Sequence, residues 1–377
     1  MLRILTLFGT RPEVIKLVSV IRALESRADR FSATTICSGQ HTTLLRPFLE
    51  RLGMRVDRDL NVMRQAQGPS EVAARVLQAL DPLFAEIRPD LLLVQGDTTT
   101  AMAGALAGFH RKVPVGHVEA GLRSGDSSSP FPEEVNRRLI TQLASYHFAA
   151  TRGNVETLVR EGVDPKRIAL TGNPGVDALQ DVLAHDKPSR AIEDLVHTHR
   201  ERRLLVLTTH RREAFGPRME EHMRVLRRFV EAREDVVMVF PVHPNPSVTD
   251  ASRTILGDCS RVHLLPPLDH PDFVYLLSRA WLIVSDSGGV QEEVATLGKP
   301  LLILRDNTER PEVIEAGLGR LVGDCPEHLG QVLEEIDTDG AWLRSAGSRP
   351  NPFGDGQSGR HIADAIERFL GREGSDG

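Results

Sequence analysis

The sequence predicts an α/β fold made of two Rossmann-like domains that face a central cleft. The first observation is length. A chain of 377 residues is longer than a domain with a single hydrophobic core usually is, so two domains of roughly 150 to 200 residues are expected. The second is that short apolar runs alternate with amphipathic helical patterns, as in a parallel sheet with helices on both faces. The third is that this alternation stops at the turn-rich passage 171–177 and then begins again.

The domain boundaries follow from that interruption. Residues 1–172 are expected to form the N-terminal Rossmann-like domain, and residues 173–356 the C-terminal one. The polar segment that continues to about Arg202 suits a linker or an irregular helix. A last helical pattern, at 357–372, is expected to pack back on the N-terminal domain.

Each strand is expected where a short apolar run ends in a turn. In the first half these runs are residues 3–8, 33–37, a short piece near Val56, 91–94, 113–118 and 146–149. In the second half they are residues 204–208, 236–241, 262–265, 281–284 and 301–304. The intervening periodicity predicts helices such as 12–24, 70–87 and 290–297, the last ending at Gly298, a typical C-terminal residue.

Composition and charge restrict the classes of function. The net charge of −6 argues against nucleic-acid binding as the main role, because phosphate-binding surfaces are usually basic. The three cysteines match no zinc or disulfide spacing, and without an H-E-x-x-H pair a bound metal is not expected. No stretch approaches the roughly 18 apolar residues of a membrane span, and the N-terminus lacks signal-peptide architecture. We therefore expect a cytoplasmic enzyme without a membrane partner.

Three carboxylates follow predicted strand ends in the first half. Asp97 follows the strand at 91–94 after Gln95 and Gly96, Glu119 comes at the end of the next one, and Glu133 lies on the loop after it. Ligands of open α/β sheets bind at the carboxyl ends of the strands, where carboxylates can transfer protons. The alternative is that Asp97 and Glu133 only cap helices.

The first strand leads into Gly9-Thr-Arg-Pro-Glu13 rather than into G-x-G-x-x-G. An NAD-type cofactor is therefore not expected at the usual place, and we predict no cofactor. A single glycine followed by Arg11, with Lys16 about one helical turn further on, suggests side-chain contacts to a phosphate. Arg11 could equally be a surface cation.

The second half contains a candidate diphosphate site. Ser285-Asp-Ser-Gly-Gly-Val-Gln-Glu-Glu293 follows a predicted strand and opens a helix. Ser287, Gly288 and Gly289 would expose N–H groups at the positive end of the helix dipole, and Glu293 could accept hydrogen bonds from a ribose. The alternative is a plain glycine turn. His210 and His243 follow two other strands, where His210 could act as an acid or contact phosphate.

Taken together, these segments resemble the non-hydrolysing UDP-N-acetylglucosamine 2-epimerases. The matching motifs occur in order along nearly the whole chain. They are Phe8-Gly-Thr-Arg-Pro-Glu13, Gly96-Asp-Thr-Thr-Thr100, Gly116-His-Val-Glu-Ala-Gly-Leu-Arg123, Ser129-Pro-Phe-Pro-Glu-Glu-Val-Asn-Arg137, Thr171-Gly-Asn173, His210-Arg-Arg-Glu213, Pro241-Val-His243, Ser285-Asp-Ser-Gly-Gly-Val-Gln-Glu-Glu293, Thr308-Glu-Arg-Pro-Glu312 and Asn351-Pro-Phe-Gly-Asp-Gly356.

The resemblance implies a glycosyltransferase-B fold and the interconversion of UDP-GlcNAc and UDP-ManNAc. In this reaction UDP leaves by anti elimination to give 2-acetamidoglucal, and adds back with inversion at C2. By motif match the catalytic group would be Asp97, Glu119, Glu133 and His210. The substrate-binding residues would be Arg11, Lys16, Arg137, His243, Phe273, Ser287, Gly288, Gly289, Glu293 and Arg310.

The residues expected for an additional, activating site are only partly present. Gln40 and Gln67 fit an additional, activating UDP-GlcNAc site, but Thr43 and Ala66 stand where glutamine and arginine are expected there. Retention of allosteric activation is thus an open question. The family also suggests a homodimer and a place in cell-envelope polysaccharide biosynthesis.

Three rival functions remain. Relatives act on other UDP-2-acetamido sugars, such as diacetamido uronic acids. A glycosyltransferase of the same fold would share the nucleotide site, although no apolar basic docking face for a lipid acceptor is evident in the first domain. A catalytically silent sugar-nucleotide sensor would not need the acidic set.

Overall fold

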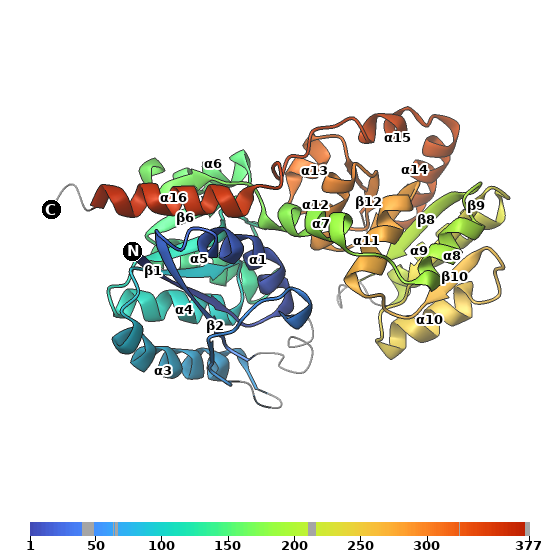
Figure 1. The fold of residues 1–377 in the computed structure, drawn as a ribbon. Helices are drawn as coiled ribbons and strands as arrows, with labels where there is room; N and C mark the ends of the chain where they lie inside the picture. The colour runs from blue at the N-terminus through green and yellow to red at the C-terminus, as the bar shows by residue number, and fades with distance from the viewer. Residues whose placement is uncertain (40–48, 63, 65–66, 210–215, 324, 374–377) are drawn as a thin grey trace. The chain divides into compact units, whose positions relative to one another are not determined.

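The protein has two compact units, each built on one parallel sheet (Figure 1). The computed structural model describes residues 1–39, 49–62, 64, 67–209, 216–323 and 325–373. One unit comprises Met1–Ala178 and Phe353–Gly377, and the other comprises Leu179–Pro352. The predicted fold class, α/β with two parallel-sheet domains, is confirmed.

The first unit contains a seven-stranded sheet in the order β3-β2-β1-β4-β5-β6-β7. Its strands are β1 (Leu2–Phe8), β2 (Phe31–Cys37), β3 (Arg58–Asp59), β4 (Leu91–Gln95), β5 (Val115–Ala120), β6 (Tyr146–Ala149) and β7 (Ile168–Leu170). Its helices are α1 (Arg11–Glu25), α3 (Pro69–Ile87), α4 (Thr99–His110), α5 (Glu133–Leu143), α6 (Arg152–Arg160) and α16 (Ser358–Glu373), and a short 3₁₀ helix spans Pro165–Arg167.

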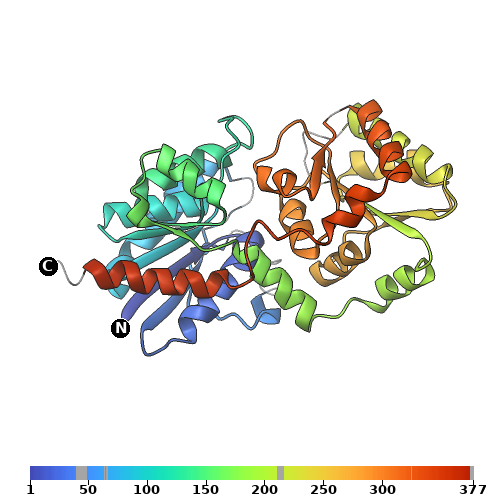
Figure 2. The same cartoon turned by 90° about the horizontal axis from the view of Figure 1, so that it is seen from above.

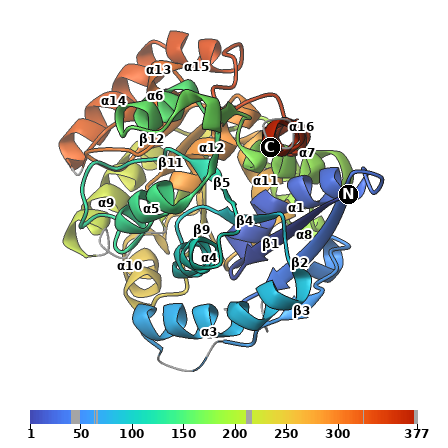
Figure 3. The same ribbon diagram turned by 90° about the vertical axis from the view of Figure 1, so that its left-hand side faces the viewer.

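Alternate residues of the first sheet enter two apolar layers. Ile4 and Leu93 pack with α1 and α16, whereas Leu5 and Leu92 pack with α3 and α4. Figure 3 shows these two helix layers on opposite sides of the sheet. Because both faces are covered, the strands are continuous apolar runs, which is why the sequence pattern revealed them.

The C-terminal helix α16 is part of the first unit. It lies along α1 (Figure 2), and its buried side chains Ile362, Ile366 and Phe369 enter the same core as α1. The Asp177 carboxylate accepts hydrogen bonds from the backbone N–H groups of Ser358 and Gly359, at 3.1 and 2.9 Å. The chain therefore leaves and re-enters this unit through two hydrogen-bonded segments.

The second unit contains a six-stranded sheet in the order β10-β9-β8-β11-β12-β13. Its strands are β8 (Arg203–Thr208), β9 (Val236–Pro241), β10 (Val262–Leu265), β11 (Leu282–Ser285), β12 (Leu301–Ile303) and β13 (Gly319–Leu321). Its helices are α8 (Arg190–Thr198), α9 (Pro217–Glu231), α10 (Pro246–Leu256), α11 (His270–Arg279), α12 (Gly288–Leu297), α13 (Pro311–Glu315), α14 (Pro326–Thr338) and α15 (Ala341–Ala346). Helices α9, α10 and α14 cover one face, and α8, α11 and α12 the other.

The structure corrects the sequence-based assignment in three places. The strand expected near Val56 lies at Arg58–Asp59. The expected polar linker contains two regular helices, α7 (Pro174–His185) and α8. The edge strands β7 and β13 were not predicted, because each is only three residues long and has half-buried or exposed positions. Gly298 ends α12 as predicted, with a φ of +62° that favours glycine.

Candidate active site

Asp97 and Glu119 lie at the ends of two neighbouring strands of the first sheet. Asp97 follows β4, and Glu119 lies near the end of β5, which pairs in parallel with β4. Between them, the Gly96 N–H donates to the Val118 carbonyl at 3.0 Å. The buried His117 ring places Nε2 2.8 Å from the Gly96 carbonyl oxygen. The backbone directly before Asp97 is therefore fixed by the adjacent strand.

Glu119 has a strained backbone and two side-chain partners. Its φ is +68°, a region that non-glycine residues rarely adopt, and the strand pairing is irregular between Val118 and Ala120. Strain of this kind persists where the surroundings enforce it, often at functional sites. Lys16 from α1 forms an ion pair with Oε1, and the Gln95 amide donates to Oε2 at 2.5 Å. One carboxylate thus receives a cation on one oxygen and a neutral donor on the other.

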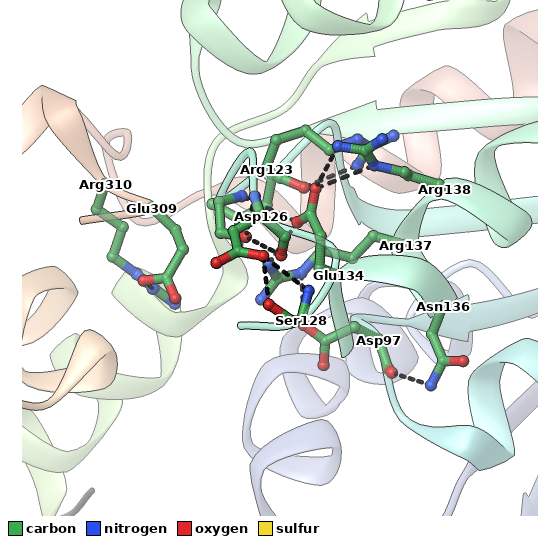
Figure 4. A network of polar contacts seen from close by, with 12 residues as sticks. Asp97, Arg123, Asp126, Ser128, Glu134, Asn136, Arg137, Arg138, Glu309 and Arg310 are labelled. Atoms are coloured by element: carbon green, nitrogen blue, oxygen red, sulfur yellow. Dashed lines mark hydrogen bonds and ion pairs between the residues drawn. The ribbon is translucent and has the colours of Figure 1, made fainter. Parts of the chain in front are cut away.

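Asp97 is held by the first turns of α5 (Figure 4). The Arg137 Nε donates to Asp97 Oδ2 at 2.7 Å, and the Asn136 amide donates to the Asp97 carbonyl oxygen at 2.9 Å. Arg137 is almost fully buried, whereas the Asp97 side chain is 24% exposed. Arg137 was expected among the substrate-binding residues; in this structure it contacts a carboxylate of the acidic group.

Glu134 is a member of this site that the sequence analysis missed. Its buried carboxylate accepts hydrogen bonds from the Ser124 N–H at 2.9 Å and from Arg137 Nη1 at 3.2 Å, and it also pairs with Arg138 (Figure 4). Burial alone would raise its pKa, but the Ser124 N–H, Arg138 and the nearby charges of Arg137 and Arg123 together lower it. The spacing Glu134, Arg137, Arg138 on one helix was the signal that could have revealed it.

Glu13 is a second missed residue. Its buried carboxylate accepts from the backbone N–H groups of Gly9 and Thr10 and from the hydroxyls of Thr10 and Thr98, at 2.7 to 3.0 Å. Burial raises its pKa above the ordinary value, and these hydrogen bonds oppose the rise. Through Thr98, Glu13 joins the loop before α1 to the loop that carries Asp97.

The remaining predicted residues of this unit lie at helix starts. Arg11 is the first residue of α1 and is exposed, and Glu133 is the half-buried first residue of α5. Glu133 makes no side-chain hydrogen bond within the described ranges of the chain. Gln67 hydrogen-bonds locally to the backbone of Val62 and Arg64. His210 and Gln40 lie outside the described residues.

In the second unit, the start of α12 has the form expected of an anion site. Ser287 is the N-cap, and its hydroxyl accepts from the Val290 N–H at 3.5 Å. Gly288 and Gly289 form the first turn, where N–H groups are not used by the helix. A Cβ atom on Gly288 would lie only 2.5 Å from Nη1 of Arg310. Glycine at this position therefore lets the Arg310 guanidinium lie against the helix start.

Arg310 is held in place by two acidic residues. Its Nε donates to the Glu292 carboxylate at 2.6 Å, and its Nη1 lies 3.6 Å from Glu309. Glu309 is itself buried and accepts a hydrogen bond from Arg305 at 2.9 Å. The sequence pattern gave no sign of this cluster, because it joins α12 to the loop after β12. The cluster thereby holds the positively charged Arg310 guanidinium beside the N-terminus of α12.

Three other predicted residues lie around this second site. Glu293 Oε1 is 3.3 Å from His270 Nε2, and Glu293 Oε2 is buried without a hydrogen-bond partner among the described residues. That oxygen could accept from a hydroxyl group of a ligand. Phe273 is partly buried against the core of this unit, and the half-buried His243 accepts from the Asn245 N–H at 3.2 Å.

The described residues contain neither a metal-binding cluster nor a membrane-spanning helix. No group of three or more His, Cys, Asp or Glu residues in the described ranges has an arrangement that could hold a metal ion. Among the helices that the structure describes, none combines the length and apolar character needed to cross a membrane.

Comparison with known proteins identifies the family. The family model described as UDP-N-acetylglucosamine 2-epimerase matches residues 22–367. The chain belongs to the UDP-N-acetylglucosamine 2-epimerase family. It is 41% identical to the UDP-N-acetylglucosamine 2-epimerase of Salmonella typhimurium over 98% of this chain and 99% of the relative. It is 42% identical to the Bacillus subtilis enzyme of the same name, over 97% and 95%.

A solved structure agrees with this membership of the UDP-N-acetylglucosamine 2-epimerase family. The crystal structure of UDP-GlcNAc 2-epimerase from Neisseria meningitidis, bound to UDP-GlcNAc, is 34% identical with a TM-score of 0.89. The match covers 97% of this chain and 100% of that one. The resemblance drawn from the sequence motifs is therefore confirmed, as is the assignment to an epimerase, and so to an isomerase.

Proposed function

We propose that this protein is a UDP-N-acetylglucosamine 2-epimerase that interconverts UDP-GlcNAc and UDP-ManNAc without a cofactor. The observation that carries the proposal is the pair of carboxylates at the ends of β4 and β5, each bound by one basic side chain. Family membership along nearly the whole chain supports the same activity.

The chemistry of the reaction explains what such a site must supply. The C2–H bond has no adjacent carbonyl to acidify it, so its cleavage depends on loss of UDP from C1. A carboxylate takes the C2 proton, the C1–O bond breaks with its electron pair on UDP, and 2-acetamidoglucal forms. UDP then adds back to C1, while a proton is delivered to the opposite face of C2. A base near C2 and a cationic diphosphate site are both required.

The first unit supports the proton-transfer half of this scheme. We assign C2 proton transfer and support of the developing C1 cation to Asp97, Glu119 and Glu133. Asp97 has one oxygen bound to Arg137, whereas Glu119 is bound by Lys16 and Gln95. These unequal surroundings suit two carboxylates with different tasks.

The second unit supports the leaving-group half. We assign the diphosphate to the start of α12 and Arg310, and the ribose to Glu293, whose Oε2 has no partner among the described residues. His243 and Phe273 are assigned to substrate binding, with Arg11 and Lys16. His210 is proposed to assist the phosphate. These roles follow the family motif.

We also propose a wider setting for the enzyme, as the family resemblance implies. The protein would act as a cytoplasmic homodimer and supply sugar nucleotides for cell-envelope polysaccharides. Sedimentation velocity of the purified protein tests the dimer: a single species at the monomer mass would contradict it.

The activity is tested by incubation with UDP-GlcNAc alone in deuterium oxide. Deuterium at C2 and formation of UDP-ManNAc, without an acceptor, are expected; a glycosyltransferase would give neither. Asp97→Asn and Glu119→Gln should each lower turnover and exchange at least about 100-fold, since each removes a proton-transfer group. Asp90→Asn, at the other end of β4 and paired with Arg3, is the matched control with expected normal turnover. Normal activity in Asp97→Asn would refute its assignment.

A further inference from the structure

The loop that carries Asp97 is supported unequally on its two sides. It spans residues 96–98 and joins β4 to α4, and β4 lies between β1 and β5 in the sheet. On the β5 side, the Gly96 N–H still donates to the Val118 carbonyl at 3.0 Å. On the β1 side, the pairing of β1 with β4 ends at Leu93. Backbone pairing with a neighbouring strand therefore reaches this loop from β5 but not from β1.

A buried carboxylate supplies a contact on the β1 side. Glu13 lies in the first turn of α1, the helix that follows β1, and only 1% of this residue is exposed. Its Oε1 accepts a hydrogen bond from the Thr98 hydroxyl at 2.8 Å. The Thr98 hydroxyl oxygen also accepts from the Ala101 N–H at 3.0 Å, which caps α4. Since a backbone N–H can only donate, the single hydrogen of that hydroxyl is left for Glu13.

Glu13 is itself held in one orientation. Its other oxygen, Oε2, accepts from the N–H groups of Gly9 and Thr10 and from the Thr10 hydroxyl, at 2.7 to 3.0 Å. These contacts fix Oε2 at the start of α1, and Oε1 is left directed at Thr98. The residue next to Asp97 is thus joined to α1 as well as to α4.

We propose that Glu13 and Thr98 are positioning residues for the C2 proton transfer. Their hydrogen bond holds the β1 side of the loop, so that the Asp97 carboxylate keeps one position relative to the substrate. A group that transfers a proton must lie within hydrogen-bond reach of it, and a small displacement is costly. This inference rests on the proposed role of Asp97. Neither Glu13 nor Thr98 need touch the substrate.

The alternative is a purely structural role for both residues. Thr98 would then serve only as the N-cap of α4, and Glu13 only as part of the capping box of α1. Loss of a helix cap lowers the stability of the fold, but it does not by itself change the kcat of the enzyme that remains folded. The two roles therefore differ in their effect on kcat.

The test is Thr98→Val, which nearly keeps the shape of the side chain and removes the hydroxyl. We expect kcat to fall about 10-fold or more with KM nearly unchanged, because the proton-transfer group is displaced and the binding residues are not. Thr98→Ser keeps the hydroxyl and should recover most of the lost kcat. Steady-state epimerisation of UDP-GlcNAc measures both parameters, and deuterium exchange at C2 follows the proton transfer directly.

Thr151→Val is the matched control. Thr151 follows β6 in the same unit, and its side chain caps α6 by accepting from the Asn154 N–H at 3.1 Å. The same substitution at this position should lower stability in urea denaturation to a similar degree and leave kcat unchanged. Full kcat in Thr98→Val would overturn the proposal. So would a loss of kcat in Thr151→Val as large as that in Thr98→Val.

A second background identifies the route of the effect. In Asp97→Asn protein, Thr98→Val should slow the residual C2 exchange no further, because its effect passes through the Asp97 carboxylate. An equal fall in that background would contradict the proposal. If Thr98→Val does not fold, Glu13→Asp shortens the carboxylate side chain by one methylene and should also lower kcat with KM nearly unchanged. Full kcat in that variant would count against the proposal in the same way.

The two levels of inference fail separately. If wild-type protein shows no C2 exchange with UDP-GlcNAc, or if Asp97→Asn is fully active, the proposed function or the assignment of Asp97 is wrong. If Asp97→Asn is strongly impaired but Thr98→Val behaves like the wild type, only the positioning role of Glu13 and Thr98 is wrong.

Discussion

The Gln95 amide and the Glu119 carboxylate are joined across β4 and β5 by a hydrogen bond of 2.5 Å. Gln95 is buried and ends β4, so its side chain is placed by the sheet itself. The backbone of Glu119 is strained, with a φ of +68°. The hydrogen bond therefore helps to hold a strained residue in one orientation.

The first prediction concerns this pair. Gln95→Leu should lower kcat about 10-fold, because Glu119 Oε2 loses its donor and the carboxylate is no longer confined to one orientation. Steady-state epimerisation with UDP-GlcNAc measures the effect. Thr6→Val, in the same sheet opposite Leu93, is the control and should retain wild-type kcat. A Gln95→Leu enzyme with full kcat would show that Glu119 needs no such support.

The same control carries a prediction of its own. Thr6 is fully buried, and its hydroxyl has no hydrogen-bond partner in the described parts of the chain. Valine has nearly the same shape without the hydroxyl, so Thr6→Val should raise the free energy of unfolding by about 1 kcal/mol. Urea denaturation measures this change. A loss of stability would mean that the hydroxyl has a partner after all.

The start of α12 gives the third prediction. A Cβ on Gly288 would lie 2.5 Å from Arg310 Nη1, and Arg310 is restrained by Glu292 and Glu309. Gly288→Ala should therefore displace the guanidinium and weaken UDP binding by about 10-fold or more, as the loss of one charged contact would. Titration calorimetry with UDP measures the affinity.

A matched glycine serves as the control for this experiment. Gly330, inside α14, has room for a Cβ, with Val225 Cγ1 at 3.7 Å. Gly330→Ala should leave UDP affinity unchanged and stabilise the helix slightly. If Gly288→Ala binds UDP as well as Gly330→Ala does, Arg310 does not contribute to the site as we propose.

The fourth prediction is a dependence of stability on pH. Burial lowers the pKa of His117 to about 4 and that of His147 to about 3. Both histidines are neutral in the folded protein at pH values where the unfolded chain, with a pKa near 6.5, takes up protons. Stability is therefore complete above pH 6.5 and falls as the pH drops below it. Between pH 6.5 and 5, the preference of each histidine for a proton in the unfolded chain should lower the free energy of unfolding by about 1.5 kcal/mol.

His147→Leu tests this dependence. The variant should lose less stability than the wild type between pH 6.5 and 5, by about 1.5 kcal/mol in urea denaturation. His110→Gln, at an exposed position at the end of α4, is the matched control. Parallel pH curves for the wild type and His147→Leu would contradict the prediction.

The sequence allowed the sheets and the predicted acidic residues to be located, because buried parallel strands are short apolar runs whose ends are easily recognised. It did not reveal β7 and β13, whose few residues are not fully buried, or the regular helices in the polar segment after Asn173. Surface helices with many polar residues resemble linkers when no neighbour is known.

The side-chain contacts within the site were harder to predict than the residues that form it. Lys16 and Arg137 were expected at the substrate, and the structure pairs them with Glu119 and Asp97. These contacts join residues 103 and 40 positions apart, so they depend on the folded arrangement rather than on local spacing. Glu134 is the exception, because its contacts to Arg137 and Arg138 are local to one helix.

The position of α16 has a consequence for synthesis on the ribosome. Ile362, Ile366 and Phe369 belong to the core that α1 also fills, and Gly359 lies against the backbone of Ser19. The ribosome therefore completes the whole of Leu179–Pro352 before it makes the helix that covers the first unit. Until then the apolar surface that α16 covers is open, and the nascent N-terminal unit is exposed to aggregation or chaperone binding. The unit translated first is thus the last that can finish folding.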